Sequence, residues 1–298
     1  MSVILDPGMQ YPPDWVFALP GGTRFVDQYG DVFGGSTPSG NNVANAVTNS
    51  AVRSALGVYL QWLGGQIPAG SLWGVRQGGG PLGELRYPNG SYNGHTGAYW
   101  AYDASTQAAS PVPGWVPGTG TTAQAQSFLD FYNGMLTNLG QWLNGQFKAD
   151  FATRELLTLP GWGERPGVGA KVVASLLTLH DEEFNEGLDW SNLLSSLPDA
   201  SHSIAYTTYL DAPSVKPTTE LEDPADFLAG LVGSHHLAGL GGENTGTPSV
   251  AAMQMVLTRA KTLNMAVVCW MSESDLVNAS GSEPTFATLK QQAASILG

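Results

Sequence analysis

Residues Leu72–Pro88 read LWGVRQGGGPLGELRYP, and this stretch decides the fold. Its apolar start is typical of a buried strand, and the three glycines that follow indicate that the strand opens into a loop. A single carboxylate, Glu84, lies in this loop between Gly83 and Leu85. An acid held at the carboxyl end of a buried strand is a candidate proton donor for catalysis.

The same order of strand, loop and helix recurs along the chain. Strands are predicted over residues 1–5, 72–80, 152–159, 203–210, 236–240 and 265–270. Helices are predicted over residues 42–63, 122–147, 168–179, 224–232, 248–263 and 286–297. Such alternation predicts an α/β fold with a parallel sheet. We therefore expect a TIM-type (β/α) barrel with about six βα units, two fewer than a complete barrel has.

An open, doubly wound sheet is the alternative to the barrel. Its phosphate-binding turn would place a glycine-rich loop directly before a helix. Here the glycines lead instead into Pro81, Leu82 and the carboxylate Glu84. The barrel is preferred for this reason, with active-site residues expected at the carboxyl ends of its strands.

The composition indicates a globular protein with long loops and excludes several partners. The chain has 298 residues, of which 12% are charged, with 38 glycines and 19 prolines. A net charge of −13 disfavours nucleic acid and anionic membranes as partners and is compatible with a neutral sugar. The single Cys269 excludes an intrachain disulfide and a cysteine-based zinc site, and we expect neither a metal nor a cofactor.

Signals for targeting are not visible in the sequence. There is no signal peptide and no membrane span. The localisation stays open between a cytoplasmic protein and one whose signal has been removed, and a soluble secreted or surface-associated protein is favoured.

A second carboxylate, Glu243 in LGGENTG, ends another predicted strand three βα units after Glu84. In a barrel this spacing places two side chains on opposite sides of the cavity. Glycosidic cleavage needs two carboxyl groups that flank the bond, one of them with a raised pKa. The pair therefore predicts a glycoside hydrolase acting on a neutral oligo- or polysaccharide, with Glu84 as the acid and Glu243 as the base or the nucleophile.

The residues around both acids resemble those of a known family. Gly83–Pro88, GELRYP, resembles the strand-4 motif of the β-amylase family, glycoside hydrolase family 14, and Gly242-Glu243-Asn244 is similar to its strand-7 motif. The segment Val268–Leu276 resembles that family's strand 8. The resemblance implies a general acid at Glu84, a general base at Glu243 and inversion at the anomeric carbon.

The resemblance also implies which barrel strand each predicted strand corresponds to. It implies that residues 1–298 form one catalytic domain that starts at barrel strand 3, with the first two βα units absent. Either a second polypeptide supplies two strands, or the barrel is excised or remodelled. The loop Asp6–Trp15 departs from the family and looks more like family 42 β-galactosidases, although those place Asn where this chain has Gly83. The class of glycosidase is therefore better supported than starch as the substrate.

Other candidate residues follow strand ends or lie in the long loop of residues 87–120. Arg76 and Arg86 are expected either to bind sugar hydroxyls or to form ion pairs with neighbouring carboxylates. Aromatic side chains stack on sugar rings, and the candidates for this role are Trp15, Tyr87, Trp100, Trp162 and Trp270. Candidate polar contacts to the substrate are Glu164, Asp211 and Asn244, and the first two are also alternative catalytic acids. A non-catalytic carbohydrate-binding or structural protein on a degenerate or split barrel is the alternative function.

Overall fold

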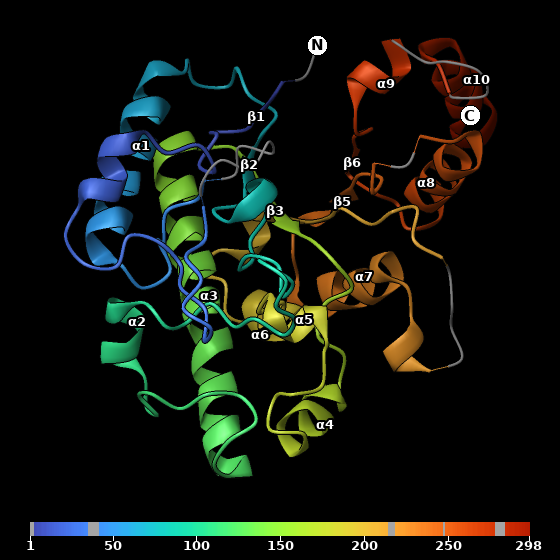
Figure 1. Ribbon diagram of the computed structural model, residues 1–298. Coiled ribbons are helices and arrows are strands. Elements are labelled where there is room, and N and C mark those ends of the chain that lie inside the picture. The colour runs from blue at the N-terminus through green and yellow to red at the C-terminus, as the bar shows by residue number, and fades with distance from the viewer. Residues whose placement is uncertain (1–2, 35–41, 214–217, 247, 278–283) are drawn as a thin grey trace.

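The computed structural model describes residues 3–34, 42–213, 218–246, 248–277 and 284–298. Its strands form one parallel sheet in which each strand lies beside the next along the chain. The strands are β1 (Ile4–Leu5), β2 (Gly74–Gln77), β3 (Arg154–Leu159), β4 (Ser203–Thr207), β5 (Gly239–Gly242) and β6 (Val267–Val268). The sheet is curled like part of a barrel, with helices on its outer side (Figure 1). The predicted α/β class and the partial TIM barrel are therefore confirmed.

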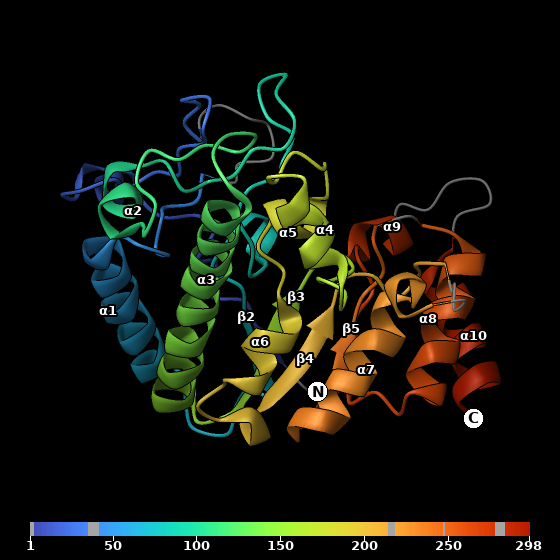
Figure 2. The ribbon, with the colours of Figure 1, turned by 90° about the horizontal axis from the view of Figure 1, so that it is seen from below.

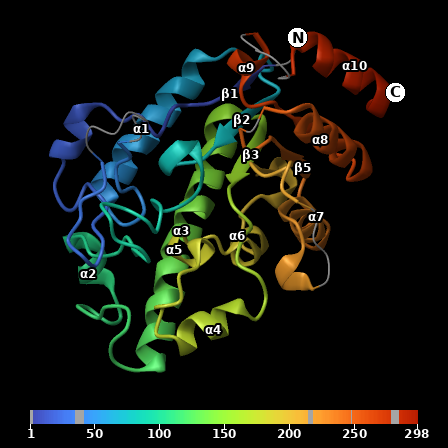
Figure 3. The same ribbon diagram turned by 45° about the vertical axis from the view of Figure 1, so that its right-hand side comes forward.

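Helices follow the strands along the chain. They are α1 (Ser50–Gln66), α2 (Ala104–Ala109), α3 (Thr122–Phe151), α4 (Val168–Ala174), α5 (Glu182–Asn185), α6 (Trp190–Ser195), α7 (Pro224–His235), α8 (Val250–Thr262), α9 (Glu273–Val277) and α10 (Phe286–Leu297). Short 3-10 helices are η1 (Asp14–Ala18), η2 (Pro81–Gly83), η3 (Ala200–His202) and η4 (Thr219–Leu221). Figure 3 shows α1 and α3 on one flank of the sheet and α7, α8 and α10 on the other. None of the helices in the described ranges is long and apolar enough to cross a membrane.

The two outer strands leave the sheet open among the described residues. β1 pairs with β2, and β6 pairs with β5, through two residue pairs each. A complete (β/α)8 barrel has no such edges, because its first and last strands pair with each other.

Local signals in the sequence explain where the longest helix lies. α3 begins with a capping box, in which Thr121 and Gln124 bind each other's backbone. Its buried stripe includes Phe128, Tyr132 and Leu136, which recur at the spacing of one helix face. The predicted helix over residues 122–147 is confirmed and extends four residues further.

Other boundaries differ from the prediction for identifiable reasons. The first helix begins at Ser50 and not at residue 42, because the Asn49 side chain accepts hydrogen bonds from the amides of Ala51 and Val52. α7 runs to His235, so β5 starts at Gly239 and lies closer to Glu243 than predicted. Four short helices in the described ranges were not predicted: α2, α5, α6 and α9.

The loops that follow the strands gather at one end of the sheet. Figure 2 shows β4 pointing toward this end, where α2, α4 and α5 also lie. This is the end at which a barrel carries its active site.

Candidate active site

Glu84 lies in a tight loop that begins where β2 ends. The amide of Gly80 donates to the carbonyl oxygen of Glu84 at 2.8 Å. The amide of Leu85 donates to the carbonyl oxygen of Thr158 on β3 at 3.0 Å. These bonds fix the acid at the carboxyl end of the sheet.

Glycine is required at two positions of this loop. A Cβ atom on Gly78 would lie 2.1 Å from the carbonyl oxygen of Gly83. A Cβ atom on Gly80 would lie 2.3 Å from the carbonyl oxygen of Arg86. The loop therefore folds back on itself at distances that only glycine permits.

The carboxyl group of Glu84 is enclosed, and the residue is 7% exposed. Burial raises the pKa of Glu84, and this effect exceeds the opposite effect of the Arg86 charge. The nearest nitrogen of Arg86 lies 3.5 Å from the carboxyl oxygen. Thr208 and Arg76 also act to lower this pKa. A carboxyl group in such a place keeps its proton to a higher pH than an exposed one, as a proton donor requires.

Arg86 joins Glu84 to a carboxyl group that sequence reasoning missed. Its second terminal nitrogen binds the side-chain oxygens of Glu186 and Asn89. Burial raises the pKa of Glu186 to about 8, against the lowering effect of Arg86. Glu186 comes directly after α5 and not at a strand end, so its position in the sequence contained no signal of this role.

Glu243 follows β5, is 4% exposed and has a different environment. One of its oxygens lies 2.9 Å from the Nη2 atom of Arg76. The other accepts a hydrogen bond from the Tyr206 hydroxyl at 2.8 Å. Both oxygens therefore act as acceptors, as in an ionised carboxylate.

Three neighbouring strands hold the partners of Glu243. Arg76 on β2 donates from Nε to the Thr158 hydroxyl on β3 at 3.2 Å, and Thr158 lies in register with Tyr206 on β4. A Cβ atom on Gly241 would lie 3.1 Å from the Tyr206 ring, so glycine on β5 leaves room for that ring. Tyr206 was not predicted, although it follows the alternation of an inward-facing strand position.

The two acids are near enough for their charges to interact. Glu84 follows β2 and Glu243 follows β5, three strands apart in the sheet, as the spacing in the sequence predicted. The negative charge of Glu243 contributes to the raised pKa of Glu84, and the charge of Arg76 opposes it. The site therefore combines a carboxyl group that favours its proton with a carboxylate that accepts two hydrogen bonds.

Asn244 and Asp211 hold the neighbouring loops. The Asn244 side chain accepts from the Met271 amide at 2.7 Å and donates to the Met271 carbonyl at 2.5 Å. Asp211 accepts a hydrogen bond from the amide of Thr245 at 2.7 Å. Both side chains thus connect the loops after β4, β5 and β6 beside Glu243.

Trp162 and Glu164, which follow β3, face different surroundings. Trp162 lines a groove of about 490 Å³ together with Arg165, Glu183 and Phe184. Glu164 accepts a hydrogen bond at 2.8 Å from Asn133 on α3, and burial raises its pKa well above the usual value. Of the two, Trp162 is the one that lines an open surface.

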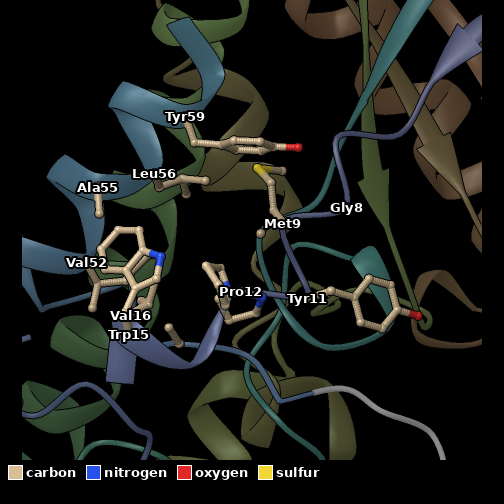
Figure 4. A pocket seen from close by; sticks show the side chains of 14 residues that line it. Gly8, Met9, Tyr11, Pro12, Trp15, Val16, Val52, Ala55, Leu56 and Tyr59 are labelled. Carbon is tan, nitrogen blue, oxygen red and sulfur yellow. The ribbon is translucent and has the colours of Figure 1, made fainter. Parts of the chain in front are cut away.

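Trp15 and Trp270 lie against helices. Trp15 is 58% exposed and lines an apolar cavity of about 220 Å³, where Figure 4 shows it beside Val52 and Ala55 of α1. Trp270 lines a groove of about 340 Å³ formed by β6, α8 and α10. Substrate binding by Trp15 and Trp270 stays a prediction.

Two predicted sugar-binding rings belong to the core. Trp100 is 0% exposed, donates from Nε1 to the Asn89 carbonyl at 3.1 Å and packs edge-on against Phe33. Tyr87 is 1% exposed and stacks on Tyr132 at 4.0 Å between ring centroids. The predictions that these two rings contact substrate are therefore corrected, because packing removes both faces of each ring from solvent.

Metal-binding side chains do not gather in the described part of the chain. No group of three or more His, Cys, Asp or Glu residues there is arranged to hold a metal ion.

Comparisons with known proteins support the fold. No family model matches the chain, and no curated protein matches it. Among solved structures, the catalytic domain of β-amylase from Paenibacillus polymyxa is similar, with a TM-score of 0.64 and 17% identity over 95% of this chain and 77% of that one. A β-galactosidase from the Antarctic haloarchaeon Halorubrum lacusprofundi is similar with a TM-score of 0.58 and 10% identity, over 98% of this chain and 47% of that one. The fold of the chain is therefore similar to the barrel fold of these two enzymes.

Proposed function

We propose that the protein is a glycoside hydrolase that cleaves O-glycosidic bonds of a neutral oligo- or polysaccharide. Glu84 is the general acid in this proposal, and Glu243 is the general base. The proposal depends most on one observation, which is that two enclosed carboxyl groups at the ends of β2 and β5 have contrasting surroundings. Such a contrast separates an acid from a base in glycosidases.

In the proposed reaction, the proton of Glu84 moves to the glycosidic oxygen as the bond from that oxygen to the anomeric carbon breaks. Glu243 takes a proton from a water molecule, whose oxygen forms the new bond to the anomeric carbon. Arg76 and Tyr206 orient Glu243 through their bonds to its two oxygens. The charge of Arg86 stabilises the Glu84 carboxylate that remains.

The finer part of the proposal is a β-amylase-like reaction with inversion. It draws on the GELRYP and GEN motifs and on the likeness of the fold to a β-amylase catalytic domain. Starch is therefore the first polymer to test, followed by neutral β-linked oligosaccharides. Proton NMR of the first product anomer distinguishes inversion from a double displacement through Glu243.

The decisive experiment compares Glu84→Gln and Glu243→Gln with the wild type on a glycan panel. We expect each variant to lose at least about 100-fold in kcat on substrates with a poor leaving group. Glu84→Gln should recover much of its rate on an aryl glycoside with a good leaving group, because that bond breaks without protonation.

Glu164→Gln is the matched control. It removes a carboxyl group that also follows a strand but binds Asn133 on α3, and its activity should equal that of the wild type. Saccharide binding without turnover, unchanged in both active-site variants, would contradict the proposal and favour a carbohydrate-binding protein.

A further inference from the structure

Two enclosed carboxyl groups share one guanidinium beside the proposed active site. The nitrogens Nη1 and Nη2 of Arg86 contact Glu84 and Glu186, respectively. All three side chains are at least nine-tenths buried. A second cation near Glu84 is Arg76, whose ion pair is with Glu243.

The backbone fixes this cluster from both sides. The Tyr87 amide donates to the carbonyl oxygen of Glu186 at 3.0 Å, and Nε of Arg86 donates to the carbonyl oxygen of Tyr87 at 3.1 Å. The acid loop and the segment after α5 are therefore connected by main-chain and side-chain contacts together. The geometry of the cluster does not depend on a single ion pair.

The charges do not balance when both carboxyl groups are ionised. One guanidinium and two carboxylates leave a net charge of −1 in an enclosed place, whereas one bound proton makes the cluster neutral. Burial makes the charged state costly, and a like charge nearby makes it more so. We propose that Glu186 is a positioning residue for the acid, one that shares Arg86 with Glu84 so that the two carboxyl groups hold one proton between them.

The inference rests on the proposed role of Glu84 and adds a reason for its protonation. An ionised Glu186 raises the pKa of Glu84, and Arg86 stabilises the Glu84 carboxylate after it has donated its proton. The coupling is reciprocal, and the charge of Glu84 raises the pKa of Glu186.

Several other charged and polar groups surround the cluster of Glu84, Arg86 and Glu186. Glu182 and Glu183 lie beside Glu186, and their charges raise its pKa. Tyr209 follows β4 and interacts electrostatically with Glu84, Glu186 and Arg86. Burial raises the pKa of Tyr209, so its hydroxyl stays neutral near pH 7. Further neighbours are Tyr132 on α3, Thr208 after β4, Asn89, and Arg76 with Glu243.

The test is the titration of Glu84 in the wild type and in Glu186→Gln. Carbon-13 NMR of glutamate-labelled protein follows the Glu84 carboxyl signal, which is assigned by its loss in Glu84→Gln. In the wild type we expect this signal to titrate in two steps. In Glu186→Gln it should titrate in one step, with its midpoint about 0.5–1 pH unit lower, since a neutral amide cannot share the proton.

Two further variants control the result. Glu186→Asp keeps the charge and should restore the two steps. Glu155→Gln removes another enclosed carboxyl group with a raised pKa, one bound to Asn144 and Ser203 and not to Arg86, and it should leave the Glu84 titration unchanged.

The outcomes separate this inference from the proposed function. An active enzyme whose Glu84 titration is identical in Glu186→Gln would overturn the inference and leave the function intact. If the wild type cleaves no glycan but the Glu84 titration still shifts in Glu186→Gln, the shared proton is supported and the proposed glycosidase function is refuted. In an active enzyme, the alkaline limb of the kcat profile should move to lower pH in Glu186→Gln and return in Glu186→Asp.

Discussion

Tyr206 donates a hydrogen bond to Glu243 from the neighbouring strand, and this contact can be removed alone. In Tyr206→Phe, Glu243 keeps its ion pair with Arg76 but loses the donor on its other oxygen. Hydrogen bonds to charged groups contribute about 1.5–3 kcal/mol, so we expect kcat to fall about 10- to 100-fold. Steady-state kinetics on the substrate found by the glycan panel would measure this fall.

Tyr99→Phe is the matched control for that change. The Tyr99 hydroxyl is enclosed and has no hydrogen-bond partner among the residues that the structure describes. Its removal should leave kcat unchanged and should not reduce the melting temperature. A Tyr206→Phe enzyme within twofold of the wild type would show that the phenol does not orient the base.

Glu155 makes folding dependent on pH. Burial raises its pKa from 4.5 to about 7, against hydrogen bonds from Ser203 and Asn144 that lower it. The folded state therefore binds a proton that the unfolded chain releases, so this group favours folding less as pH rises from about 4.5 to about 7. The rise in pKa corresponds to a loss of at most about 3 kcal/mol across that range.

Urea unfolding at pH 5 and pH 8 tests this effect. The stability of Glu155→Gln relative to the wild type is the difference between their free energies of unfolding. This difference should shift in favour of the folded variant by about 1–3 kcal/mol from pH 5 to pH 8. If variant and wild type differ in free energy of unfolding by the same amount at both pH values, Glu155 has the same pKa in the folded and unfolded states, which would contradict the prediction.

At the scale of elements, the acid loop is the part whose shape the chemistry needs most. Gly78→Ala would place a Cβ atom 2.1 Å from the Gly83 carbonyl oxygen, so the loop has to move. We expect kcat to fall at least about 100-fold, because a displacement of about 1 Å misplaces Glu84. Gly134→Ala on α3 is the control, since its Cβ meets no atom within 4 Å and the change should stabilise the helix by about 0.5–1 kcal/mol.

Kinetics and thermal unfolding together separate the two glycine variants. Gly78→Ala should lose activity at a temperature at which circular dichroism still shows a folded protein. Wild-type activity in Gly78→Ala would contradict the placement of the acid by this loop.

Elements with a long apolar stripe were predictable, whereas short ones were not. α3 and α10 lie where their periodicity indicated, since three or more turns repeat the pattern of one apolar face, which is buried in α3 and partly buried in α10. α5 has four residues, which is too short for periodicity, and its start depends on the Asp181 cap. The position of Glu186 was hidden for the same reason.

At the scale of the molecule, charge is the dominant property. The formal net charge is −13, so negative groups repel one another across the surface. Raising NaCl from about 0.05 M to about 0.5 M shortens the screening length from about 14 Å to about 4 Å. We expect the melting temperature to rise by about 2–5 °C at pH 7.5.

Calorimetry at the two salt concentrations measures this effect, and pH supplies the control. Near the sequence pI of about 4.6 the net charge vanishes, so the salt effect should vanish as well. A melting temperature that falls with NaCl at pH 7.5 would mean that attractive ion pairs outweigh the net repulsion.

The sequence by itself determined the parallel α/β architecture and the two acids at strand ends. Alternating periodicities specify strand and helix order, and glycines around Glu84 and Glu243 mark strand ends, because these are local properties of the chain. Only the tertiary structure decided which groups face the acids. Arg76, Tyr206 and Glu186 contact the acids or their partners from separate elements. Trp100 and Tyr87 are buried because packing between distant segments decides which side chains reach solvent. The same packing buries Glu84 and so raises its pKa.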